Sequence, residues 1–186
     1  MMIGQKSMEE YIQVMKMPGL IYVAWAFLML SASFTSFDTY VILGGLALLV
    51  YLFLGCYVGW VANRNGFGIR ETLIAGMLFG GFMGLLDGVA GAVVMIQNNQ
   101  TSEIFSVIIE QVMEDYSLGR EEAIQSIVVS SILFSPLLWG LVMCILSTIG
   151  FFIHRYFWKT DNERVLYEEP PPKKRKRRMN KRFKRK

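Results

Sequence analysis

The sequence predicts an all-α, polytopic membrane protein with four transmembrane helices packed through glycine. Its 186 residues are 53% apolar and 13% aromatic. The apolar residues are gathered into four long runs, at 17–37, 39–63, 72–97 and 127–153, and Asp87 is the only charged residue within them. A helix of about 20 apolar residues crosses the hydrocarbon core of a bilayer. A soluble chain of this length cannot bury four helices that are apolar on every side.

Each run predicts one membrane-spanning helix of a bundle that covers residues 17–158. We expect the spans at about 18–36, 40–63, 71–96 and 127–157. Two of the connections between them are short. The third connection, residues 98–126, is long enough to have a structure of its own.

The distribution of Lys and Arg predicts the orientation of the helices, because cytoplasmic loops carry an excess of these residues. The N-terminus, the second connection and the segment after the fourth span each carry at least two of them. The first connection has none, and residues 98–126 have only Arg120. This alternation predicts a multi-pass protein of the cell membrane whose two termini are both cytosolic and whose long connection faces outward.

The outward segment is predicted to be an amphipathic helical region. Ile104, Ile108 and Val112 form an apolar stripe, which is broadened by Phe105, Ile109 and Met113, and acidic residues lie mainly on the other side. Ser117 is expected to cap a new helix that begins with acidic residues and runs into the fourth span, bent near Pro136. The acidic segment is interpreted as a hairpin that lids the bundle, with a cation-attracting vestibule or an extracellular partner site as alternatives.

Residues 1–16 are predicted to form a short amphipathic helix on the cytosolic membrane surface. Ser7 and Glu10 fit the capping box S-x-x-E, in which two side chains bond the first N–H groups of a helix. Pro18 is expected to open the first span. Four apolar residues line one face of the preceding segment: Met8, Tyr11, Ile12 and Met15.

Glycines that recur every four residues predict close packing between helices. Such a spacing keeps the glycines on one helix face, where another backbone can approach closely. We expect intramolecular packing, with the hypothesis that the glycine faces of the second and third spans meet each other; the alternative is a homo-oligomer formed through the third span. The packing residues are Gly55 and Gly59 in the second span and Gly76, Gly80, Gly84 and Gly88 in the third.

Asp87 is the only acidic or basic side chain well inside a predicted span. A charge at this depth is costly and usually indicates a function or a protected polar contact. We expect Asp87 in the outer half of the third span, facing the glycine groove, and either protonated or bonded to Ser or Thr hydroxyls. It is interpreted as a carboxyl that locks helices together, with a proton or cation relay as the alternative.

Signals for catalysis or for a bound cofactor are close to absent. His154, the only histidine, lies beside aromatic and basic residues at the end of the fourth span, which is typical of a membrane interface. Cys56 and Cys144 lie within spans without a metal-binding spacing, and we interpret them as apolar filler. No nucleophile elbow, Walker sequence or zinc-protease motif occurs. We therefore expect a protein that is not an enzyme and holds no metal or cofactor.

A basic turn links two glycine-rich spans between residues 55 and 81. The residues of this pattern are Gly55, Gly59, Ala62, Arg64, Gly68, Gly76 and Gly80. The pattern resembles the core of a family of small four-helix membrane proteins of archaea and some bacteria whose function is unknown. The resemblance covers only this part of the chain and implies no activity.

A polybasic segment ends the chain. Eleven of the 19 Lys and Arg residues lie within residues 173–186, where no acid occurs, whereas residues 1–172 carry a net charge of −7. We expect a disordered tail, because like charges repel and little apolar surface is available to order them. An acidic, proline-containing linker at 159–172 is expected to separate the tail from the bundle. The basic residues of the tail are Lys173, Lys174, Arg175, Lys176, Arg177, Arg178, Lys181, Arg182, Lys184, Arg185 and Lys186.

The tail predicts an anionic partner on the cytosolic side. Anionic lipid headgroups are the nearest candidate. RNA, above all at a membrane-bound ribosome, is the second, through counterion release, and an acidic protein is the third. Two classes of function follow. One is a non-enzymatic membrane scaffold or adaptor that recruits such a partner, and the other is a small cation or proton channel or transporter that uses Asp87 and an acidic outer vestibule.

Overall fold

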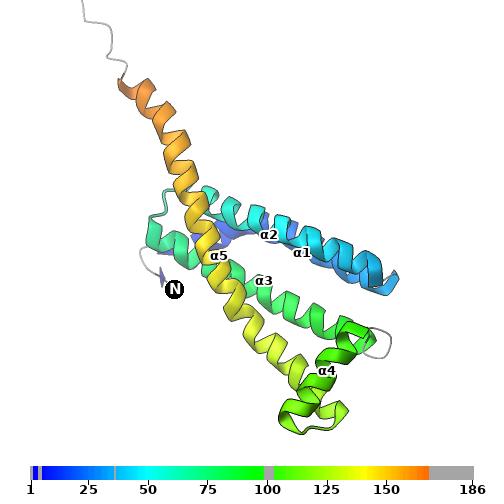
Figure 1. Ribbon diagram of the computed structural model, residues 1–186. Helices are drawn as coiled ribbons and strands as arrows, with labels where there is room; N and C mark the ends of the chain where they lie inside the picture. The colour runs from blue at the N-terminus through cyan, green and yellow to red at the C-terminus, as the bar shows by residue number, and fades with distance from the viewer. Residues whose placement is uncertain (1, 4–5, 36, 99–102, 168–186) are drawn as a thin grey trace, which may run out of the picture.

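The computed structural model describes residues 2–3, 6–35, 37–98 and 103–167. These residues contain five helices, which confirms the all-α class (Figure 1). The helices are α1 (Met8–Thr35), α2 (Phe37–Arg64), α3 (Ile69–Asn98), α4 (Glu103–Tyr116) and α5 (Arg120–Tyr167). Two short antiparallel strands, β1 (Met2–Ile3) and β2 (Lys6–Ser7), precede α1 and were not predicted. The polybasic tail, residues 173–186, lies outside the described residues.

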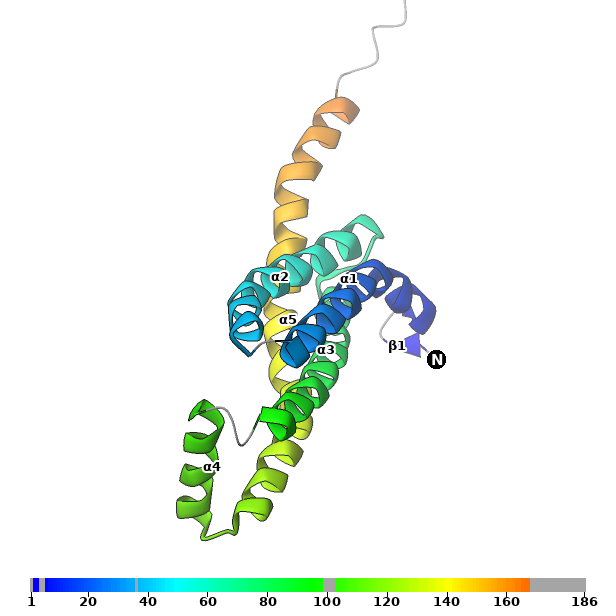
Figure 2. The ribbon, with the colours of Figure 1, turned by 90° about the vertical axis from the view of Figure 1, so that its right-hand side faces the viewer.

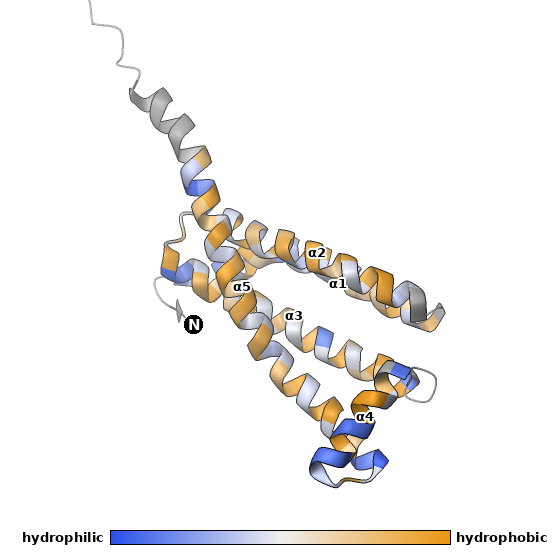
Figure 3. Ribbon diagram, viewed as in Figure 1, coloured by the Kyte–Doolittle hydropathy of each residue, from blue (hydrophilic) through white to orange (hydrophobic). Residues whose placement is uncertain are grey.

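Four of the helices are long and apolar enough to cross a membrane, as the sequence predicts. Their candidate spans are Met8–Phe34, Thr39–Arg64, Ile69–Gln97 and Arg120–Phe157. Large apolar side chains face outward along these helices, which are largely orange in Figure 3; Leu48 and Phe134, for example, are each 66% exposed. Such a surface is unfavourable in water and is solvated well by lipid. The chain is therefore a multi-pass membrane protein.

The bundle is built from two pairs of helices. α1 packs beside α2, α3 packs beside α5, and α5 also crosses α2 (Figures 1 and 2). The contact between α3 and α5 is the most extensive of these. Although α2 and α3 are consecutive, they contact each other less than each contacts α5. The main core cluster includes Tyr22, Leu54, Phe79 and Met83.

A tight turn joins α2 to α3. The Gly66 N–H donates to the Asn63 carbonyl and the Phe67 N–H donates to the Ala62 carbonyl, each at 3.0 Å. This pair of bonds is the Schellman motif, which satisfies carbonyl groups at a helix end. Gly66 has a φ of 71°, a left-handed conformation that glycine adopts without steric cost.

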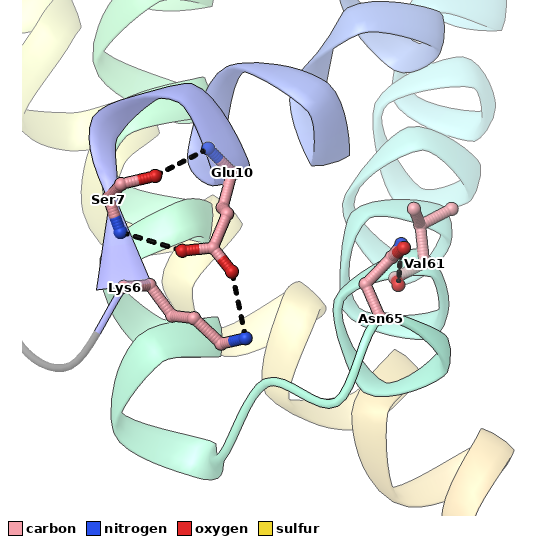
Figure 4. A network of polar contacts seen from close by, with 5 residues as sticks. All are labelled: Lys6, Ser7, Glu10, Val61 and Asn65. Atoms are coloured by element: carbon pink, nitrogen blue, oxygen red, sulfur yellow. Dashed lines mark hydrogen bonds and ion pairs between the residues drawn. The ribbon is translucent and has the colours of Figure 1, made fainter.

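The predicted capping box begins α1 (Figure 4). The Ser7 N–H donates to a Glu10 carboxylate oxygen at 2.8 Å, and the Glu10 N–H donates to Ser7 Oγ at 3.4 Å. Lys6 Nζ lies 2.9 Å from the other carboxylate oxygen of Glu10. These contacts provide partners for N–H groups that have none within the helix. The same view shows Asn65 Nδ2 donating to the Val61 carbonyl, at 2.8 Å, near the end of α2.

α1 is one continuous helix, whereas the sequence predicts a surface helix followed by a span. The helix continues through Pro18, and the side chains of Tyr11, Val14 and Pro18 are buried. The Tyr11 ring packs edge to face on Phe67 of the α2–α3 turn, with 5.2 Å between the ring centroids. This tertiary contact holds the N-terminal part of α1 against the bundle, so the prediction of a separate helix at 1–16 is wrong.

The outward segment forms helices as predicted, and its inner face is the broadened side of the predicted apolar stripe. Ile109 is fully buried and packs with Met95 of α3 and Ala123 of α5. Phe105, Val112 and Met113 are partly buried against this cluster, whereas Ile108 is 41% exposed; the Ile104 side chain lies outside the described part. α4 packs against the start of α5 and lies away from α1 and α2 in Figure 2. It therefore covers only the α3–α5 end of the bundle.

Gly119, and not Ser117, caps α5. Ser117 follows the last residue of α4 with a φ of 53°, a left-handed conformation typical of a residue that ends a helix. The Gly119 carbonyl accepts the Ala123 N–H at 2.9 Å, and the Gly119 N–H donates to the Glu122 carboxylate at 3.1 Å. The predicted cap is thus wrong by two residues, whereas the early acid does bond the start of the helix.

α5 continues beyond the predicted end of the fourth span. It contains Pro136 and ends at Tyr167, so residues 159–167 of the predicted linker are helical. No proline or glycine occurs between residue 151 and Pro170, and nothing in that stretch is therefore expected to break the helix. Residues 168–172 lie outside the described residues.

Candidate functional site

Both predicted glycine rows face α5. A Cβ added at Gly55 would collide with the Leu146 side chain, and one at Gly59 would collide with the Ser147 backbone. On α3 an added Cβ would collide with α5 backbone atoms at every position of the row, namely Gly76, Gly80, Gly84 and Gly88. The hypothesis that the glycine faces of the second and third spans meet each other is therefore wrong. α5 lies against both faces.

α5 contributes a close contact that sequence reasoning missed. A Cβ added at Gly150 would collide with the Cys56 backbone of α2. Ser147, nearby on α5, is fully buried, and its hydroxyl donates to the Cys144 carbonyl of its own helix at 3.0 Å. The two glycines of α5, Gly140 and Gly150, are ten residues apart, so no four-residue repeat signals this face in the sequence.

Asp87 is bonded to tyrosines of two other helices. The Tyr22 hydroxyl of α1 lies 2.5 Å from Asp87 Oδ1, and the Tyr51 hydroxyl of α2 lies 3.2 Å from the same oxygen. Phenols thus take the place of the expected Ser or Thr hydroxyls. Asp87 faces α1 and α2, whereas the neighbouring Gly88 faces α5, because consecutive residues point about 100° apart around an α-helix. The prediction that Asp87 faces the glycine groove is therefore wrong.

The hydrogen bonds around Tyr22 fit both protonation states of Asp87. The Tyr22 hydroxyl has one proton and two neighbouring acceptors, Asp87 Oδ1 and the Met83 carbonyl at 3.0 Å. When Asp87 is ionised, the phenol donates to the carboxylate. When Asp87 is protonated, the carboxyl can donate to the phenol oxygen while the phenol donates to Met83. The cluster can therefore hold or release a proton while its heavy atoms stay in place.

Tyr22, Tyr51 and Asp87 lie near the middle of the candidate spans of α1, α2 and α3. The sequence-based prediction did not include the two tyrosines, because the partners of Asp87 were expected among Ser and Thr hydroxyls and because a first span that starts at residue 18 puts Tyr22 near the cytosolic end. Since α1 begins at Met8, Tyr22 lies much deeper. The sequence does carry a signal for Tyr22 and Tyr51: one span contains a lone acid, and the neighbouring spans contain phenols at a matching depth.

A cavity of about 280 Å³ lies beside this cluster. Asp87 and Tyr51 line it together with Tyr40 of α2 and Trp139 of α5. The Tyr51 and Trp139 rings pack edge to face, with 4.7 Å between their centroids. Much of the remaining lining consists of small residues: Ala26, Gly44, Ala47, Ala90 and Gly91.

The glycines at the cavity differ from those that pack against α5. A Cβ added at Gly91 would have no atom within 4 Å, and one at Gly44 would meet only the end of the Met29 side chain, at 4.0 Å. Gly91 lies one helical turn after Asp87 on the same face of α3. These glycines leave open space near the carboxyl, whereas the Gly76–Gly88 row brings another backbone close.

His154 anchors the other end of the bundle. Asn63 Nδ2 lies 3.0 Å from His154 Nδ1 and donates to the Phe151 carbonyl at 3.1 Å. Because an amide nitrogen is only a donor, His154 Nδ1 accepts this bond and the neutral ring has its proton on Nε2. The His154 ring also packs edge to face on Trp60, with 5.6 Å between the centroids. These contacts tie the end of α2 to α5.

The two cysteines pack within the bundle, in the part of the chain that the structure describes. Cys56 and Cys144 are both free thiols there, and Cys144 Sγ lies 3.4 Å from the Leu73 carbonyl of α3. Among the described residues no group of three or more His, Cys, Asp or Glu side chains is placed to hold a metal ion.

Fold and site together define a multi-pass helical membrane protein in which two phenols bond a carboxyl group near the middle of the candidate membrane spans. Comparison of the chain with protein-family models, with curated proteins and with solved structures found no match. The resemblance of residues 55–81 to small archaeal and bacterial membrane proteins stays a prediction.

Proposed function

We propose that this protein is a small membrane transporter of protons or other cations that uses Asp87. The observation that carries the proposal is the bonding of Asp87 to Tyr22 and Tyr51 at the edge of a cavity. Among the described residues that line this cavity there is no Lys, Arg or His to neutralise the carboxylate. A carboxylate within the membrane is costly unless its charge is neutralised, and phenols do not neutralise it. Without a basic partner, Asp87 would therefore bind a proton or another cation.

We propose that the protein lies in the cell membrane with both termini on the cytosolic side, as the distribution of Lys and Arg predicts. The cavity is lined by the parts of α1, α2 and α3 that lead to the outward connections, including Leu30, Tyr40 and Val94. A cation would therefore enter from outside. Glu110 and Asp115 of α4 are exposed at the α3–α5 side of this outward end, and acidic groups on that side of the membrane raise the local concentration of cations.

Flux in liposomes tests this function. The protein is reconstituted with a pH-sensitive dye inside the vesicles, and proton uptake is followed after a pH jump, with and without Na⁺ or K⁺ gradients. We expect a flux that Asp87→Asn abolishes. Glu9→Gln, which neutralises an exposed acid near the N-terminus, is the matched control and should leave the flux unchanged. Equal flux for the wild type and Asp87→Asn would exclude a relay through Asp87.

The glycine contacts are proposed to hold the bundle together within one chain. This role is supported by the collision that an added Cβ would produce with α5 at each of the six predicted glycines. Because α5 occupies the glycine row of α3, the intramolecular role is favoured over a homo-oligomer formed through that face. Apolar burial provides little drive for association within lipid, so close backbone packing has to supply it.

A second function, as a membrane adaptor, is proposed for the tail on the basis of its composition. Eleven basic residues without an acid would bind anionic lipid headgroups or RNA from the cytosolic side. A pull-down at graded salt, with the full chain and with a chain that lacks residues 173–186, distinguishes the partners. Co-purified RNA or ribosomes that disappear with the tail would identify nucleic acid, and anionic vesicles captured in the same way would identify lipid. Equal capture by both chains would refute the adaptor function.

A further inference from the structure

We propose that the cavity beside Asp87 binds a small organic ammonium ion. This inference rests on the proposed function, because it names the class of cation that the same carboxyl would take. Four features of the cavity support it: the aromatic walls, the unequal bonding of the two carboxylate oxygens, the shortage of oxygen ligands for a metal ion, and the space beside the two open glycines.

The aromatic rings provide the first part. Tyr40, Tyr51 and Trp139 all line the cavity together with Asp87. A cation near the face of a Tyr or Trp ring is attracted by the negative charge density of the π system, and sites for quaternary ammonium groups are commonly built from such rings. An anion would be repelled by both the rings and the carboxylate. The lining therefore selects for positive charge.

The carboxylate provides the second part. Asp87 Oδ1 receives both phenol contacts, from Tyr22 and Tyr51. Asp87 Oδ2 accepts no hydrogen bond from the residues that the structure describes. A carboxylate oxygen accepts more than one hydrogen bond, and a bound ammonium ion would provide a donor for Oδ2. Asp87 can thus keep its bonds to both helices while it faces a ligand.

The shortage of oxygen atoms excludes a hard metal ion. Ca²⁺ takes 6–8 oxygen ligands and Mg²⁺ requires a near-octahedral set. The side chains that line the cavity provide one carboxylate and the hydroxyls of Tyr40 and Tyr51, and the remaining ones are apolar, apart from the indole of Trp139. An organic ammonium ion needs few oxygen ligands and benefits from contact between its alkyl groups and apolar walls. The lining suits the organic ion better.

The open glycines set the size of the ligand. The cavity measures about 280 Å³, close to the lower end, about 300 Å³, of the range for small-molecule pockets. Space at Gly44 and Gly91 accounts for part of this volume, since neither position has an atom closer than 4.0 Å to an added Cβ. A small head group with short alkyl substituents fits this volume, and a large polycyclic cation does not.

Binding of choline chloride to the purified full-length protein, followed by isothermal titration calorimetry in detergent, tests the inference. We expect saturable binding with one site per chain. The neutral isostere 3,3-dimethylbutan-1-ol, which has carbon in place of the quaternary nitrogen, should bind at least roughly tenfold more weakly if charge recognition dominates. Asp87→Asn should abolish choline binding, and Trp139→Leu should weaken it roughly three- to tenfold.

A cavity-filling pair of variants controls for folding. Gly91→Leu places a side chain in the cavity without altering Asp87 or an aromatic ring, and it should abolish choline binding. Gly81→Leu is the matched control on the same helix, because a Cβ there also meets nothing within 4 Å and Gly81 does not line the cavity. It should bind choline as the wild type does.

The outcomes separate this inference from the function on which it rests. Proton flux that depends on Asp87, without choline binding, would overturn the ammonium site and leave the transporter standing. If the protein shows no flux and does not bind choline, both the transporter and the ammonium site are overturned. Equal binding of choline and its neutral isostere, or unchanged binding by Gly91→Leu, would also overturn the ammonium site.

Discussion

The Tyr22 hydroxyl of α1 lies 2.5 Å from Asp87 Oδ1 of α3 and 3.0 Å from the Met83 carbonyl, one turn earlier on the same helix. A single phenol thus connects two helices through Asp87, the only acidic side chain deep in the bundle among the residues that the structure describes. Because the hydroxyl has one proton and two acceptors, its bonding changes with the protonation state of the carboxyl. This relationship connects the stability of the bundle to the site.

Loss of the Tyr22 hydroxyl should destabilise the bundle. Tyr22→Phe removes the bond between α1 and α3, and hydrogen bonds between helices in membranes contribute about 0.6–2 kcal/mol each. Unfolding in mixed micelles with increasing SDS measures the loss. Tyr57→Phe is the matched control, because the Tyr57 ring stacks between Phe53 and Trp60 and its hydroxyl makes no hydrogen bond within the described residues. Equal stability of the two variants would contradict the role of the Tyr22 bond.

Leucine at Gly80 should disrupt the contact between α3 and α5. A Cβ there would collide with the Trp139 backbone, which cannot yield as a flexible side chain does. Overpacking of this kind costs about 1–3 kcal/mol or more. Gly81→Leu provides the comparison, since the next residue has open space around its Cβ. The account fails if Gly80→Leu and Gly81→Leu unfold at the same SDS concentration and elute at the same size.

Truncation of Tyr11 should loosen the N-terminal part of α1. Tyr11 is fully buried against Phe67, and replacement of a buried aromatic side chain by Ala costs about 3–5 kcal/mol. Ile12, which is 55% exposed, provides the control, and Ile12→Ala should change stability by less than about 0.5 kcal/mol. Proteolysis near residue 16 reports the effect directly. If this segment were a separate surface helix, Tyr11→Ala and Ile12→Ala would both reduce the stability only slightly and to the same extent.

Cysteine labelling tests the predicted orientation. In a chain with Cys56→Ala and Cys144→Ala, single cysteines replace Asn65 in the α2–α3 turn or Tyr116 at the end of α4, both of which are exposed. A maleimide that cannot cross the membrane should label Tyr116→Cys in intact cells and Asn65→Cys only after lysis. The reverse pattern would invert the topology and place the cavity on the cytosolic side.

The helices were predictable because each depends on a local property of the chain. Long apolar runs specify the spans whatever their neighbours are, and the capping box of Ser7 and Glu10 is a signal within one turn. The start of α1 was missed because Lys6, Glu9, Glu10 and Lys16 indicate an interface, whereas the contact of Tyr11 with Phe67 depends on residues far apart in the sequence. No local pattern contains that contact.

The site was only half predictable for the same reason. Asp87 was singled out as a lone acid in an apolar span, but its partners were sought among short hydroxyl side chains. Glycine spacing likewise did not reveal function, because Gly88 packs against α5 whereas Gly91, on the same helix, leaves open space. Which of the two roles a glycine has depends on the helix opposite, and only the tertiary structure defines that helix.

Infrared spectroscopy detects directly whether the Asp87 carboxyl exchanges a proton. A protonated carboxyl absorbs in a region of the spectrum that the carboxylate leaves empty, so a pH titration of the reconstituted protein reports proton uptake at this group. We predict that subtraction of the Asp87→Asn spectra from the wild-type spectra leaves a carboxyl band that appears and disappears with pH, and that this band shifts in frequency in Tyr22→Phe. Identical titrating carboxyl bands in the wild type and Asp87→Asn, at every pH at which the protein is folded, would contradict the claim that Asp87 exchanges a proton.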